Sequence, residues 1–168
     1  MAQIFVKAAL ALLLIRLSLG YFLGVWGGNK LMASEQSVQL FQYFYGVATD
    51  RQVVSLLGLM QIGLAVAIVL GVWRKPVYLA GLAVHSITIL VIGDSLLAPF
   101  TIEDGFPVNR GYAASVPVWA AFATLWLLRK LDWMSIDQRR TLRMFISIID
   151  WRNPFRHLMT QSRWDRAT

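Results

Sequence analysis

The chain has 168 residues, which suits one domain and is short for two. Hydrophobic residues make up 57% and charged residues 15%, whereas an average soluble domain has roughly 45–50% and 25%. This composition excludes an ordinary soluble globule and an intrinsically disordered chain. The net charge of +7 suits an anionic membrane surface or nucleic acid. The absence of cysteine excludes disulfides, Cys-ligated zinc and iron–sulfur clusters.

Four apolar stretches are long enough to cross a bilayer, whose hydrocarbon layer needs about 20 helical residues. They cover residues 8–26, 53–73, 77–97 and 111–128. The sequence therefore predicts an all-α integral membrane protein, with a four-helix transmembrane bundle at residues 1–130 and a cytoplasmic amphipathic tail at 131–168. The turn from Trp73 to Pro76 is so short that the second and third spans should be antiparallel neighbours.

Basic residues outside the spans predict the orientation. Twelve lie on the side that holds the two termini and the turn between the second and third spans, and three lie on the other side. The positive-inside rule then places both termini in the cytoplasm.

The segment from Asn29 to Gln52 follows the first span on the outer side. Val38, Phe41 and Tyr45 recur at helical spacing within it, which predicts a short helix lying in the outer interface. The outer loop from Ala98 to Arg110 is expected to be irregular.

The sequence of the tail predicts two basic amphipathic helices. Ser135 and Gln138 have capping-box spacing at the start of the first helix, and Asn153-Pro154 separates it from the second. The arginines that would meet the anionic inner leaflet, or a soluble partner, are Arg139, Arg140, Arg143, Arg152 and Arg156. We expect no nucleic-acid partner, because topology already explains the basic residues.

Arg16, Gln61 and His85 are three of the few polar residues inside the predicted spans, where an ionisable group costs several kcal/mol. Counted from the predicted span ends, Arg16 and His85 lie about 12 Å from the inner side and Gln61 about 18 Å, at 1.5 Å per residue. This similar depth predicts a buried polar pocket. The alternatives for Arg16 are snorkelling to the inner headgroups, a structural hydrogen bond or a ligand role, and those for His85 are a structural bond or a functional one.

Small residues share helix faces with these polar groups. Gly20, Gly24 and Gly28 follow Arg16 at intervals of four residues, and Gly81 precedes His85 by four. Such spacing predicts close helix packing. At the outer mouth, Lys30, Asp94 and Arg110 are candidates for a charge cluster, with solvated loop charge as the alternative. The other histidine, His157, lies in the tail, so a haem held by two histidines within the spans is excluded.

The segment from Arg16 to Leu31, with its Leu-Gly step, Phe-Leu pair and Gly-rich approach to Lys-Leu, resembles the opening signature of the DoxX family. The stretch from Gly58 to Gly63, followed by Leu70-Gly71 and a basic turn, resembles that family's second helix. Gln61 departs from the pattern, since the family often has glutamate there. The family contains small bacterial and archaeal membrane proteins, including the small subunit of thiosulfate:quinone oxidoreductase.

The resemblance implies a bacterial inner-membrane protein that works with other membrane subunits. Two functions stay open. In the first, the chain is a subunit of a quinone-linked oxidoreductase or respiratory-type complex, and Arg16, Gln61 and His85 hold a quinone head. In the second, it is a non-catalytic accessory subunit that packs against a larger membrane complex and binds lipid. No covalent cofactor, haem or iron–sulfur cluster is expected on this chain.

Overall fold

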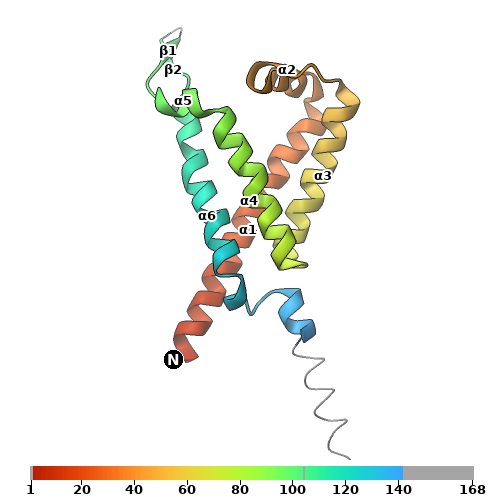
Figure 1. Ribbon diagram of the computed structural model, residues 1–168, viewed down its shortest axis with the longest axis vertical. Coiled ribbons are helices and arrows are strands. Elements are labelled where there is room, and N and C mark those ends of the chain that lie inside the picture. Colours follow the sequence, from red (N-terminus) through yellow and green to blue (C-terminus); the bar gives the residue numbers. More distant parts are fainter. Residues whose placement is uncertain (1, 104, 142–168) are drawn as a thin grey trace, which may run out of the picture.

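The computed structural model describes residues 2–103 and 105–141, and this part of the chain is mostly helical (Figure 1). The long helices are α1 (Ala2–Met32), α3 (Arg51–Leu70), α4 (Arg74–Val91) and α6 (Ser115–Leu127). The shorter ones are α2 (Ser34–Tyr45), α5 (Gly93–Leu97) and the 3₁₀ turns η1 (Arg110–Ala114) and η2 (Arg129–Leu131). A further helix runs from residue 136 to 141. Two-residue strands, β1 (Ile102–Glu103) and β2 (Phe106–Pro107), pair antiparallel in the loop before α6.

The long helices pack as two pairs. Helix α1 packs along α3, and α4 packs along α6. Figure 1 shows the pairs diverging from the α3–α4 turn, with α2 at the far end of one pair and α5 and the strands at the far end of the other. The predicted contact of the second and third spans is therefore limited to the region near their turn. Where the pairs meet, Leu19, Ile68 and Phe122 belong to one buried apolar cluster.

One face of α1 is buried along most of its length. Ala9, Leu12, Arg16, Leu19 and Leu23 are all at most 3% exposed. They recur at alternating intervals of three and four residues, the spacing of a helix packed against near-parallel neighbours. Arg16 thus occupies a core position in an otherwise apolar stripe.

Glycines explain how closely these helices approach. A Cβ on Gly20 would lie 2.2 Å from Val69 Cγ2, and one on Gly81 would lie 2.7 Å from Phe122 Cε1, which confirms both as packing residues. Gly24 and Gly28 have nothing within 4 Å of such an atom, so their predicted packing role is wrong. The contact face follows the three-four spacing and reaches Gly27, whose added Cβ would lie 2.9 Å from Gly58 O.

Two helices, α1 and α3, are long and apolar enough to cross a membrane by length and composition. Helix α4 has 18 residues and α6 has 13, which correspond to about 27 Å and about 20 Å. The predicted third span, 77–97, is divided at Ile92 between α4 and α5, and the predicted fourth span, 111–128, begins with the 3₁₀ turn η1.

The predicted helix between the first two spans is confirmed as α2, which stacks Phe41 on Tyr45 at 5.0 Å between ring centroids. The loop after α5 is mostly irregular apart from its two short strands. In the tail, Ser135 Oγ accepts a hydrogen bond from the Gln138 backbone N–H at 3.4 Å, which confirms the predicted helix start. Arg143, Arg152, Arg156 and the rest of the predicted amphipathic stripe lie outside the described residues.

Candidate functional site

The α3–α4 turn contains two residues in the left-handed backbone region. Gly71 ends α3 with φ +66°, and Trp73 precedes α4 with φ +47°. Glycine adopts this conformation without steric cost, whereas a side chain such as that of Trp73 is strained there. The compact turn brings the Arg74 backbone N–H within 3.0 Å of Asp137 Oδ2, on the helix that follows α6.

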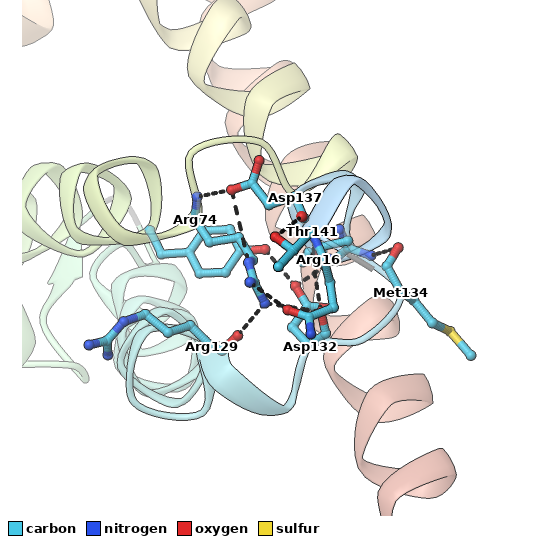
Figure 2. Close-up of polar contacts among 10 residues, drawn as sticks. Arg16, Arg74, Arg129, Asp132, Met134, Asp137 and Thr141 are labelled. Carbon is cyan, nitrogen blue, oxygen red and sulfur yellow. Dashed lines mark hydrogen bonds and ion pairs between the residues drawn. The ribbon is translucent and has the colours of Figure 1, made fainter. Parts of the chain in front are cut away.

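A buried ion pair lies beside this turn (Figure 2). Arg16 Nε from α1 lies 3.5 Å from Asp132 Oδ2, and the two side chains are 1% and 0% exposed. Arg16 Nη2 donates a hydrogen bond to Met134 O at 3.2 Å, and the hydroxyl of the buried Tyr78 donates one to Asp132 Oδ2 at 2.7 Å. One carboxylate thereby joins α1, α4 and the segment that follows α6.

Arg74 makes a second set of contacts around the same segment (Figure 2). Its Nη1 donates to Arg129 O at 2.7 Å and to Asp132 O at 3.2 Å, and its Nη2 donates to Gln138 Oε1 at 2.9 Å. The planar guanidinium suits this role because its donors point in fixed directions. The Gln138 side chain bonds to Arg74, so only the Ser135 half of the predicted capping box forms.

We call Arg16, Arg74, Tyr78, Asp132 and Asp137 the polar joint. Gly71 is part of its packing, since a Cβ at this position would lie 2.1 Å from Arg16 Nη1 and 2.6 Å from Ser135 Cβ. A residue other than glycine would therefore meet both a strained backbone and the buried guanidinium.

The polar joint is closed to solvent at its centre. Arg16, Tyr78 and Asp132 are each at most 1% exposed. Within the described part of the chain, Arg16 Nη1 and Asp132 Oδ1 make no hydrogen bond. A buried ion pair of this kind is strongly destabilised when one partner is removed, because the other charge is then left uncompensated. The arrangement can hold the segment from Arg129 to Gln138 against the bundle.

The structure does not bring Arg16, Gln61 and His85 into one hydrogen-bonded site. Gln61 Oε1 accepts a hydrogen bond from Lys30 Nζ at 2.8 Å, between α1 and α3. His85 Nε2 lies 3.0 Å from Ser115 O, and its ring packs near those of Phe22 and Phe122 at 5.6 and 5.7 Å between centroids. Each of the three residues has its own partners.

The predicted shared depth fails because Arg16, rather than Ala8, lies level with the α3–α4 turn, and α1 extends beyond that level. Arg16 packs against Gly71 at the end of α3. Gln61 lies ten residues before Gly71, which is about 15 Å back along that helix. His85 is seven residues beyond Tyr78, or about 10 Å along α4. Arg16 forms a hydrogen bond within the chain, but to Met134 O and beside Asp132, neither of which the sequence indicated as its partner.

The three outer charges also occupy separate places. Lys30 bonds to α3, while the exposed Asp94 lies in the first turn of α5 and the exposed Arg110 begins η1, at the far end of the other helix pair (Figure 1). No ion pair joins these three residues in the structure as described.

Sequence reasoning missed Asp132 and Tyr78 as partners of Arg16. A usable signal was that only four acidic residues, Asp132, Asp137, Asp150 and Asp165, lie on the side that holds twelve basic ones. A buried arginine needs a carboxylate, and Asp132, directly after the last apolar span, is among the few near that end.

Within residues 2–103 and 105–141, no group of three or more His, Cys, Asp or Glu side chains could hold a metal ion. No protein family, curated protein or solved structure matches the chain.

Proposed function

We propose that the chain is a four-span membrane protein of the bacterial inner membrane, with both termini in the cytoplasm. The length and composition of α1 and α3 support the first two crossings. Helix α4, and α6 extended by η1, supply the other two in this proposal. The excess of basic residues beside the termini and the α3–α4 turn supports the orientation.

Large apolar side chains on the outside of the helices support a lipid environment. A soluble monomer rarely exposes large continuous apolar patches. Here every long helix exposes such residues at 40% or more; examples are Leu14 and Leu17 on α1, Leu56 and Met60 on α3, Ile87 and Leu90 on α4, and Val116 and Leu127 on α6.

Within the membrane, the function best supported is that of an accessory subunit that packs against a larger complex and binds lipid. The observation that carries this proposal is the internal pairing of the buried ionisable groups. Arg16 and Asp132 pair with each other, and His85 bonds to a backbone carbonyl. Groups paired in this way stabilise the bundle.

The DoxX resemblance suggests that the larger complex is a quinone-linked oxidoreductase or a respiratory-type complex. A quinone head held jointly by Arg16, Gln61 and His85 does not fit the geometry, because their hydrogen bonds lie in three different places. The proposal therefore assigns this chain to assembly and lipid contact and derives no redox step from it.

The test is to purify the intact complex from native membranes and to compare Gln61→Met and His85→Asn variants with the parent. Quinone-dependent turnover, normalised to the amount of assembled complex, should be unchanged in both. A loss of more than tenfold in a variant that assembles normally would show that the residue acts in catalysis, and would refute the accessory assignment.

A further inference from the structure

We propose that the exposed surface around the polar joint binds the phosphate groups of anionic phospholipids, through Trp73, Lys75, Lys130 and Trp133. We call these four residues the collar. This inference rests on the proposed membrane location and adds a defined site and ligand chemistry to it.

The first observation is the conformation of Trp73. It is 74% exposed while its backbone has φ +47° and ψ +47°, so the strain is not offset by burial of the indole within the chain. Exposed residues in sparsely populated backbone regions indicate a role beyond packing. Tryptophan is enriched where membrane meets water, because its ring is apolar and its N–H is a donor. Trp133, 45% exposed, is the second such ring at this end.

The second observation is an excess of unpaired positive charge. Lys75 and Lys130 are exposed, as are Arg139 and Arg140 beyond the collar, and none of them forms an ion pair with the residues that the structure describes. Within residues 105–141, the two carboxylates of the same segment are already used, because Asp132 is buried against Arg16 and Asp137 bonds to Arg74. The surface thus presents cations to an anion supplied from outside.

The polar joint brings together the two chain segments that carry the four collar residues. Trp73 and Lys75 flank Arg74, whose side chain bonds to the carbonyls of Arg129 and Asp132. Lys130 directly follows Arg129 in the chain, and Trp133 directly follows Asp132. Figure 2 shows Arg74, Arg129 and Asp132 meeting at this point. Two rings and two ammonium groups, from the start of α4 and from the segment around η2, are therefore brought to the same end of the bundle.

The experiment uses the full chain purified in detergent and incubated with equal amounts of phosphatidylglycerol and phosphatidylcholine. Native mass spectrometry then counts the lipids that the protein retains. The parent should retain phosphatidylglycerol in preference. The double variant Lys75→Gln plus Lys130→Gln should retain less phosphatidylglycerol. Each of the two charges removed should lower the affinity for this lipid about fivefold. Lys75→Arg plus Lys130→Arg should preserve it, and so should the control Arg110→Gln at the opposite end.

Trp73→Gly separates lipid binding from folding. Glycine tolerates the left-handed backbone, so this variant should melt at or above the parent's temperature in lipid-free detergent while it retains less phosphatidylglycerol. A lower melting temperature would make Trp73 a structural residue and overturn its place in the collar.

Two further outcomes would overturn the proposal. The first is that the double Gln variant keeps the parent's preference for phosphatidylglycerol. The second is that Arg110→Gln loses this preference as much as the double Gln variant does. A protein that resides in the membrane but prefers neither lipid contradicts only this inference. A protein absent from the membrane fraction contradicts the proposed function itself.

Discussion

The buried pair of Arg16 and Asp132 allows a quantitative test of the polar joint. The perturbation is a double-mutant cycle of Arg16→Met, Asp132→Asn and the two combined. Each single change leaves a polar or charged group buried without its partner, at a site where the parent side chains are 1% and 0% exposed. Such a loss typically costs about 3–5 kcal/mol, a large part of the 5–15 kcal/mol that stabilises an ordinary domain.

The combined variant should cost less than the sum of the two single changes. Methionine fills much of the space of the arginine stem, and asparagine can still accept the hydrogen bond from Tyr78. The coupling free energy should therefore lie near the upper part of the usual range of about 0.5–3 kcal/mol for residues in contact.

The assay is reversible unfolding of the purified protein in detergent, followed by circular dichroism. The matched control is the exposed ion pair of Arg51 and Glu35, whose side chains are 65% and 68% exposed. Removing that pair should change the unfolding free energy by about 0–1 kcal/mol. Single changes at Arg16 and Asp132 that cost no more than the control would refute the account of the joint.

Two further predictions concern the same region. Gly71→Ala should destabilise the protein by at least about 1–2 kcal/mol, because it strains a backbone at φ +66° and displaces Arg16. Gly24→Ala should be tolerated in the same unfolding experiment, because no atom lies within 4 Å of a Cβ added there. Arg74→Lys keeps the charge but loses the guanidinium that reaches Arg129 O, Asp132 O and Gln138 together. The segment is then held less firmly, so trypsin should cleave at Arg139 or Arg140 faster than in the parent. Unchanged cleavage would mean that Arg74 does not hold this segment.

The helices could be predicted from the sequence where apolar runs are long. The runs around α1 and α3 each correspond to one observed helix, and the aromatic spacing before α3 predicted α2. The end of α4 could not be placed, because the apolar run continues through Ile92 into α5 without a change in composition. The start of α6 could not be placed either, because the predicted span at 111–128 includes most of η1.

The candidate site was harder to predict, because it depends on which residues lie at the same level. Taking Ala8 as the inner end of the first span placed Arg16 about 12 Å too deep and associated it with Gln61 and His85, whereas Arg16 lies level with Gly71. Its partner in the structure, Asp132, follows α6 and η2 and is brought back to α1 by a turn whose geometry no local pattern reveals. Interval-of-four spacing correctly identified Gly20 and Gly81 but also selected Gly24 and Gly28, which face away from the contact.

The four crossings are tested most directly by single cysteines, since the chain contains none of its own. The exposed residues Gln39, Lys75, Glu103 and Lys130 lie in the four successive segments that follow the proposed spans. Each is replaced by cysteine in turn. The variant is treated with a maleimide that does not cross the inner membrane, first in intact cells whose outer membrane has been permeabilised and then after lysis. We expect labelling of Gln39→Cys and Glu103→Cys in intact cells, and of Lys75→Cys and Lys130→Cys only after lysis. Labelling of all four positions from the same side would contradict the proposed four crossings.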